Sequence, residues 1–175
     1  MRRFVLLIVI FIFCFNLYAD DEKKDTFNNS FLLGAGFTWT NNPRLLGGHF
    51  EFGIVLYQNI LYIQNNFMLR GGGLNINGSD YTIFTLSDKL IFGNKTLKPL
   101  KLYVYLEGGG GIFGNQTKKF FGDPCAITGG FGGGGEIFSE DFGGIYIEVG
   151  YIGQRTNLNY PVSGIIIQVG WRIFF

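Results

Sequence analysis

The chain has 175 residues, of which 15% are charged and 18% aromatic, and its formal net charge is +1. An average soluble domain has about 25% charged residues, so this chain has few charges for a soluble protein. Basic residues adjoin one another at most in pairs, such as Lys118 and Lys119, which are too short for a nucleic-acid-binding face or a basic lipid-binding patch. We therefore expect no nucleic-acid partner.

The first 19 residues have the pattern of a cleavable signal peptide. Arg2 and Arg3 precede an apolar run over residues 4–15, and Ala19 is followed by an acidic stretch. The run is shorter than the roughly 18 apolar residues that a membrane-spanning helix needs. An alternative interpretation makes Cys14 a lipidated cysteine, but the residue before it, Phe13, is bulky where lipoprotein signals usually have a small one.

We therefore predict three segments: a signal peptide over 1–19, a short periplasmic segment over 20–29 and a folded domain over 30–175. Removal of Arg2 and Arg3 from the 14 basic residues leaves 12, against 13 acidic ones, which is a net charge of −1. The exported part keeps one cysteine, Cys125, and so forms no internal disulfide.

The glycine content indicates strands rather than helices. All 28 glycines follow residue 19, so they make up about 18% of the remaining 156 residues, against a usual frequency of roughly 7%. High aromatic content and alternating runs between turn residues predict many strands joined by tight turns. In chain order we predict eight strands, near 30–40, 46–57, 60–70, 79–92, 99–112, 125–138, 143–154 and 162–175.

Four of these segments share one alternating design, in which every second residue is apolar. The first strand has Phe31, Leu33, Ala35, Phe37 and Trp39 on one face, and the second has Phe50, Phe52, Ile54 and Leu56. The seventh has Ile145, Ile147, Val149 and Tyr151, and the last has Ile165, Ile167, Val169, Trp171, Ile173 and Phe175. The opposite face of each is rich in glycine and isolated polar residues.

Three places fit this design poorly. Asp88 and Lys89 are consecutive, so one of them must lie on the apolar face unless a bulge or a headgroup position intervenes, and Asn65 also falls on that face. The glycine runs 108–111 and 132–135 weaken the alternation in the fifth and sixth strands, where we expect bends or close backbone approach.

The sparse polar face decides which side of the sheet faces inward. A soluble barrel would expose that face, which carries glycines and lone charges rather than a dense charged surface. A membrane barrel turns the apolar face to lipid and encloses the polar residues in a narrow lumen. We therefore predict an all-β, closed, antiparallel, up-and-down transmembrane β-barrel. A soluble periplasmic ligand carrier remains the alternative fold.

The predicted signal peptide, the eight alternating strands and the terminal run Gly170-Trp171-Arg172-Ile173-Phe174-Phe175 resemble the small bacterial outer-membrane β-barrel proteins of the OmpX, OmpA-domain or OmpW type. The resemblance extends over nearly all of residues 30–175. It implies a location in the cell outer membrane, contact with outer-membrane lipid and a monomeric state. It also implies that Phe175, supported by Ile173 and Trp171, is the signal that the barrel-assembly machinery reads.

The topology implied by the resemblance places both termini in the periplasm, which makes 41–45, 71–78, 113–124 and 155–161 the outer loops. Of these, the third carries Lys118, Lys119, Phe120 and Phe121. This loop is the candidate for contact with a lipid sugar, another protein or a host surface. Its alternative interpretation is a solvated loop with aromatic residues at the bilayer rim.

Inside the predicted barrel we expect an ion-pair network. The alternation places Lys101, Glu107, Glu136, Glu148 and Arg172 on the lumen face, where charges are tolerated only when they are paired and hydrogen-bonded. An eight-stranded barrel has an interior just wide enough for side chains. We therefore expect no wide pore.

Catalysis has little support in the sequence. The only histidine, His49, lies two residues from Glu51 on the same face, which is a conceivable base with an orienting carboxylate, but no serine lies in a nucleophile motif. We predict no metal and no cofactor, and no enzyme. The leading function is a structural or surface-interaction barrel with short loops. The alternatives are a narrow channel for small or hydrophobic solutes and a lipid-modifying enzyme that uses His49.

Overall fold

The structure is a computed structural model that describes residues 31–41, 44–58, 61–76, 79–94, 99–115, 125–139, 143–155 and 162–175. The predicted signal peptide, the segment 20–29 and the loop residues Lys118 to Phe121 lie outside these ranges. No helix in the described part of the chain is long and apolar enough to cross a membrane.

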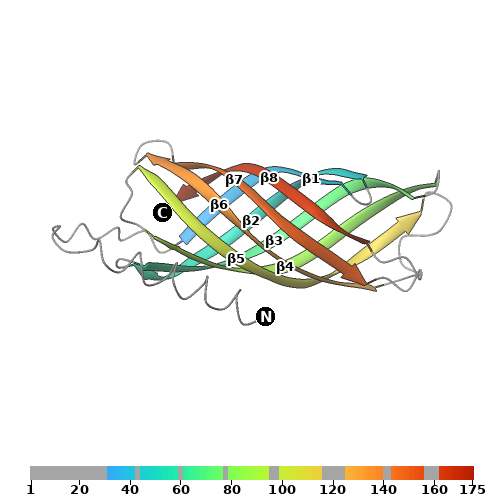
Figure 1. The fold of residues 1–175 in the computed structure, drawn as a ribbon, viewed down its shortest axis with the longest axis horizontal. Helices are drawn as coiled ribbons and strands as arrows, with labels where there is room; N and C mark the ends of the chain where they lie inside the picture. Colours follow the sequence, from blue (N-terminus) through green and yellow to red (C-terminus); the bar gives the residue numbers. More distant parts are fainter. Residues whose placement is uncertain are drawn as a thin grey trace, which may run out of the picture.

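Eight antiparallel strands form one closed barrel in which each strand pairs with its neighbours in chain order (Figure 1). The strands are β1 (Phe31–Asn41), β2 (Arg44–Gln58), β3 (Leu61–Ile76), β4 (Ser79–Asn94), β5 (Leu100–Asn115), β6 (Cys125–Ser139), β7 (Gly143–Arg155) and β8 (Val162–Phe174). The predicted all-β, closed, up-and-down barrel is therefore confirmed.

The barrel is closed by pairing of its first and last strands. Residues Leu32 to Thr40 of β1 pair antiparallel with residues Phe174 to Ile166 of β8. At one end, the Phe175 N–H donates to the Phe31 carbonyl oxygen at 2.9 Å, and the Phe31 N–H donates back at 3.4 Å. We call this end, where β1 begins and β8 ends, the terminal end, and the other the opposite end.

The strands are strongly tilted. Partners can be followed around the barrel from Ile173 of β8 through Leu33, Phe52, Phe67, Asp88, Gly108, Gly129 and Gly153 to Ser163 of the same strand. One full turn thus shifts the register by 173 − 163 = 10 residues. This stagger is the shear of the barrel, and each step along the turn moves further from the terminal end.

Some strands are longer at the opposite end than the sequence predicts. The predicted loop 71–78 is wrong over residues 71–76, which continue β3, and the predicted loop 113–124 is wrong over 113–115, which end β5. Asn41 and residues 44–45 also belong to strands. The glycines at 71–73 suggested a turn, but Gly71 and Gly72 pair with Gly48 and Gly47 of β2. A Cβ on Gly72 would lie 3.0 Å from the Leu46 carbonyl oxygen, so glycine permits close strand approach there.

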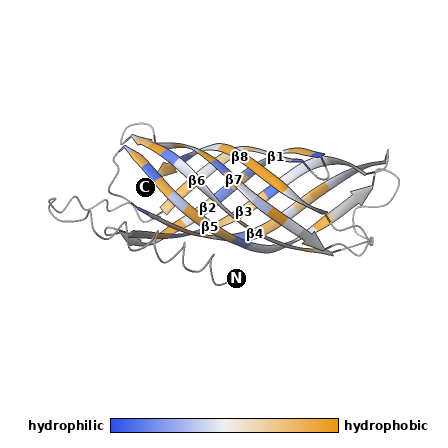
Figure 2. Cartoon of the chain, viewed as in Figure 1, coloured by the Kyte–Doolittle hydropathy of each residue, from blue (hydrophilic) through white to orange (hydrophobic). Residues whose placement is uncertain are grey.

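The apolar faces of the strands point outward. Large apolar side chains on the outside are well exposed, such as Phe37 at 74%, Phe50 at 69% and Ile145 at 66%. The alternating bands of hydropathy along the strands are visible in Figure 2. The lumen face instead holds buried polar residues, among them Arg172, Glu148 and Lys89, each 0% exposed. The predicted arrangement, in which the apolar face points outward and the polar face lines the lumen, is therefore confirmed.

Candidate functional site: a charged lumen and an uneven outer face

Arg172 of β8 is the central cation of the lumen. Its guanidinium forms a two-pronged bond with Glu51 of β2, with Nε donating to Oε1 at 2.7 Å and Nη2 to Oε2 at 3.2 Å. Nη2 also donates to Glu148 Oε1 at 2.8 Å, and Nη1 donates to Glu136 Oε2 at 3.3 Å. The face of Tyr146 lies 3.7 Å from its Cζ. One arginine thus joins three carboxylates and an aromatic ring from three other strands, β2, β6 and β7.

Two further cations, Lys89 and Arg70, extend the network in the lumen. Lys89 Nζ of β4 donates to Glu148 Oε2 at 2.6 Å and to Gln168 Oε1 at 3.1 Å. Arg70 of β3 lies 3.1 Å from Glu107 Oε1, and the Ser87 hydroxyl donates to the same oxygen at 2.8 Å. Each carboxylate therefore has a cationic partner, which is the condition for burying charge in a low-dielectric interior.

Lys101 lies nearer to the terminal end and is less enclosed. Its Nζ is 4.0 Å from Glu136 Oε1 and lies over the rings of Phe138 and Phe174, 4.2 Å and 4.4 Å from their centroids. These two rings pack edge to face at 5.2 Å. A cation held by two aromatic faces fills the lumen at this level.

Among the described residues, the charges on the lumen face balance in number. The four cations and four anions are Arg70, Lys89, Lys101, Arg172, Glu51, Glu107, Glu136 and Glu148. Every strand from β2 to β8 contributes at least one of them. Since the pairs connect strands far apart in sequence, the network ties the barrel together across its axis.

Glycines on the lumen face make room for large polar side chains. A Cβ on Gly132 would lie 2.7 Å from Tyr105 Cζ, and one on Gly170 would lie 2.6 Å from Tyr146 Oη. A Cβ on Gly134 would lie 2.9 Å from Tyr103 Cζ. Replacing these hydrogens with methyl groups would displace tyrosines that are themselves at most 5% exposed. Lumen-facing glycines of β6 and β8 therefore make room for the tyrosines that fill the interior.

His49 of β2 points into the lumen and is engaged at both ring nitrogens. Nδ1 hydrogen-bonds with the Thr38 hydroxyl at 2.8 Å, and Nε2 hydrogen-bonds with the Tyr146 hydroxyl. Glu51 bonds with Arg172 and Asn66. The described residues contain no group of three or more histidine, cysteine, aspartate or glutamate side chains able to hold a metal ion.

All five residues predicted for the lumen network lie on the lumen face, but three partners were missing from that prediction. The sequence places Glu51 on the polar face beside His49 without assigning it to the network, and it leaves open whether Asp88 or Lys89 faces inward. It does not single out Arg70, although the alternation of β3 through Gln64, Asn66 and Met68 places this residue on the same face. Strict counting by two along β3 and β4 would have found Arg70 and Lys89.

The outer face has one polar pair in its apolar surface. β3 and β4 pair without a bulge through this region, so Lys89 points inward and Asp88 points outward. Asn65 Nδ2 of β3 donates to Asp88 Oδ1 at 2.7 Å, and the pair is exposed. Along β4, the outward residues are Phe84 and Leu86 on one side of Asp88 and Leu90 and Phe92 on the other.

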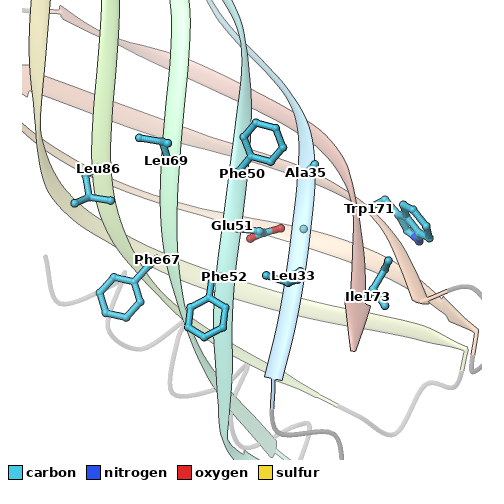
Figure 3. A pocket seen from close by; sticks show the side chains of 11 residues that line it. Leu33, Ala35, Phe50, Glu51, Phe52, Phe67, Leu69, Leu86, Trp171 and Ile173 are labelled. Carbon is cyan, nitrogen blue, oxygen red and sulfur yellow. The ribbon is translucent and has the colours of Figure 1, made fainter. Parts of the chain in front are cut away.

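A shallow hollow of about 530 Å³ lies on the outside beside this pair. Its floor is the small side chain of Ala35 in β1, and Figure 3 shows the rings of Phe50 and Phe52 on one side of Ala35 and that of Trp171 on the other. Phe67 and Leu86, the residues next to Asp88, line the far edge. The outer face therefore has a hollow next to a polar pair in an otherwise apolar surface.

The residues predicted as the assembly signal lie on this outer face near the terminal end. Trp171, Ile173 and Phe175 are 49%, 37% and 61% exposed. Trp171 and Ile173 line one edge of the hollow, and Phe175, the next outward residue, is not among the lining residues.

Three solved structures have a similar fold over most of their own length. Neisserial surface protein A (NspA) matches with a TM-score of 0.61 and 13% identity, over 83% of this chain and 96% of that chain. The outer membrane enzyme PagL matches with a TM-score of 0.56 and 10% identity, over 80% and 98%. The N-terminal β-barrel domain of Pseudomonas aeruginosa OprF matches with a TM-score of 0.52 and 16% identity, over 83% and 98%.

No family model and no curated protein matches the sequence. The likeness to the solved structures is one of fold, and this fold is that of the small outer-membrane β-barrels. The chain therefore has the fold of these barrels, with an apolar exterior and a charge-balanced lumen.

Proposed function

We propose that the protein is a barrel of the cell outer membrane that acts through its surface, as a structural or adhesin-like element rather than as a wide pore. The observation that carries this proposal is the filled lumen. Arg172, Tyr105, Tyr146 and Lys89 are all at most 2% exposed, and Lys89 of β4 bonds to Glu148 of β7 across the lumen. Side chains that fill the interior leave the loops and the outer face as the surfaces available to partners.

The outer loop over 113–124, with Lys118, Lys119, Phe120 and Phe121, is the proposed contact site for a surface or host ligand. It lies outside the described residues, so its support is the sequence pattern of paired lysines beside paired aromatics. NspA, which has a similar fold, is named as a surface protein, and this supports such a role.

We propose that the barrel-assembly machinery reads Trp171, Ile173 and Phe175. Support comes from their position. The three side chains project from the last strand on the outside, and Phe175 adds a backbone pair with Phe31 that completes the closure of the barrel. Deletion of Phe175 is expected to reduce the amount of folded barrel in the outer membrane while the unfolded precursor accumulates.

A narrow hydrated conduit is the second candidate. Six buried polar atoms on the lumen face have no hydrogen-bond partner among the described residues: Arg70 Nε and Nη1, Thr85 Oγ1, Tyr105 Oη, Thr128 Oγ1 and Glu136 Oε1. Of these, Arg70 Nη1 and Glu136 Oε1 lie within ion-pair distance of Glu107 and Lys101. Buried polar groups are usually satisfied by protein or water, which favours water in this part of the lumen. Discrete single-channel conductance in planar bilayers would support a conduit, and its absence would favour the closed surface barrel.

We propose no catalytic role for His49, because Thr38 and Tyr146 occupy both of its ring nitrogens. A substitution of His49 by glutamine is therefore expected to leave the lipid composition of the membrane unchanged. Altered acylation of membrane lipid in cells with the wild-type chain, abolished by His49→Gln, would overturn this.

The primary test is membrane fractionation combined with heat-modifiable gel mobility. We expect the protein in the outer-membrane fraction, and a folded band whose mobility changes on boiling. A tag inserted between Lys118 and Phe121 should bind antibody on intact cells. Recovery in the soluble periplasmic fraction, as for a ligand carrier, would overturn the proposal.

A further inference from the structure

The pair of Asp88 and Asn65 is an unusual feature of a lipid-facing surface. On the register turn from Ile173 to Ser163, Asp88 is the fifth of nine positions, so it lies halfway between the two ends of the barrel. Two apolar residues follow it on each side along the outside of β4. This is the depth at which an ionisable side chain facing lipid is most costly, and such residues are commonly functional.

The pair is only half satisfied within one chain. Asn65 Nδ2 donates one hydrogen to Asp88 Oδ1 at 2.7 Å. In the described part of the chain, neither Asp88 Oδ2 nor Asn65 Oδ1 has a hydrogen-bond partner, and the second amide hydrogen of Asn65 has no acceptor. In hydrocarbon there is no water to supply these partners.

The surface around the pair permits close approach by another chain. On the β5 side, Gly108 faces outward beside Asp88, and a Cβ there would meet nothing within 4 Å. No contact within the barrel therefore requires glycine at 108. On the β3 side, Phe67 and Leu86 form the edge of the hollow around Ala35. Small residues beside a polar pair are typical of contacts between proteins inside membranes.

We propose that this face, defined by Asn65, Asp88, Gly108 and the hollow edge at Phe67 and Leu86, is a contact surface between two copies of the chain. The occupant follows from hydrogen-bond complementarity. Each copy offers a free amide hydrogen on Asn65 and a free carboxylate oxygen on Asp88. A two-fold arrangement pairs each with the other copy's counterpart and leaves only Asn65 Oδ1 without a partner. Each barrel stays complete, and two barrels associate side by side, which departs from the monomer expected from the sequence.

Self-association can be measured on the full exported chain by sedimentation equilibrium in detergent and by energy transfer in vesicles of phosphatidylethanolamine and phosphatidylglycerol. We expect a reversible dimer. Asp88→Leu should weaken association roughly tenfold, since it removes two reciprocal hydrogen bonds, and Asp88→Asn should keep most of it, because an amide also donates and accepts. A monomer in both media, or a dimer unaffected by Asp88→Leu, overturns the proposal.

Cysteine cross-linking tests the location independently of Asp88. In a Cys125→Ser background, Leu86→Cys should form an intermolecular disulfide in vesicles. The matched control is Ile147→Cys on β7, which is also exposed, at 54% against 61% for Leu86, and should not cross-link. Equal cross-linking at both positions, or none at Leu86, contradicts this face. Heat-modifiable mobility reports barrel folding separately, so a lack of pairing leaves the proposed function intact.

Discussion

The lumen face and the outer face of this barrel are built from the same strands but obey opposite rules. Inside, four cations and four carboxylates are packed with tyrosines against glycines. Outside, apolar side chains such as Phe37 and Ile127 are more than 70% exposed. The difference teaches that charge here is structural where it is enclosed and paired, whereas a polar residue on the outside, such as Asp88, calls for a partner beyond the chain.

The largest effect is expected at the centre of the lumen. Arg172→Leu leaves Glu51, Glu136 and Glu148 without their shared cation, and removal of one member of a buried ion pair costs about 3–5 kcal/mol. Urea unfolding in detergent, followed by heat-modifiable mobility, should show the loss. Unchanged urea resistance would refute the role assigned to Arg172.

Next comes a charge placed on the outer face. Val149 lies in the middle of β7 and is 51% exposed. Val149→Lys should destabilise the barrel in lipid vesicles by about 2–4 kcal/mol, since a lysine at the bilayer midplane has no partner. The control is Ser139→Lys at the terminal end of β6, where a cost of about 0–1 kcal/mol is expected. Equal costs at both positions would argue against a bilayer around this surface.

Substitutions of glycine compare the lumen face with the outer face without a change in charge. A Cβ on Gly150 would collide with the Tyr105 hydroxyl and the Phe131 carbonyl oxygen, whereas a Cβ on Gly73, on the outer face, would meet nothing within 4 Å. Gly150→Ala should lower the free energy of unfolding by about 1–3 kcal/mol, and Gly73→Ala should leave it unchanged or slightly raised. If Gly150→Ala is as stable as wild type, the tyrosines do not fill the lumen as described.

The smallest effects distinguish paired from unpaired hydroxyls in the lumen. Ser87 donates to Glu107 at 2.8 Å, whereas Thr85 Oγ1 has no partner among the described residues. Ser87→Ala should cost about 1 kcal/mol, and Thr85→Val, which keeps the shape, should be close to neutral. Guanidinium unfolding curves measured in parallel would check the order; a larger loss for Thr85→Val would indicate that its hydroxyl binds an ordered water.

The alternation of apolar and polar residues with a period of two predicted most of the fold. It predicted eight strands, their faces and the inward position of residues such as Arg172 and Glu148, because a strand turns successive side chains to opposite sides. The glycine run at 71–73 misled, since glycine serves both turns and close strand approach, and only the pairing with Gly47 and Gly48 decides between them.

The partners within the lumen could not be predicted. Glu51 and Arg172 are 121 residues apart and meet across the axis because of the register and the tilt of the strands. Neither quantity is contained in local sequence. Likewise, the pairing of Asn65 with Asp88 depends on the register between β3 and β4, although each residue alone stood out as polar on an apolar face.

The central claim, that the apolar face meets hydrocarbon, can be tested with the chain's own fluorescence. Both tryptophans, Trp39 and Trp171, lie on the outer face of adjacent strands. In vesicles that contain brominated phospholipid, the emission of the protein should be quenched, and single-tryptophan variants Trp39→Phe and Trp171→Phe should each retain this quenching. Emission that brominated lipid leaves unchanged while aqueous acrylamide quenches it would contradict the account.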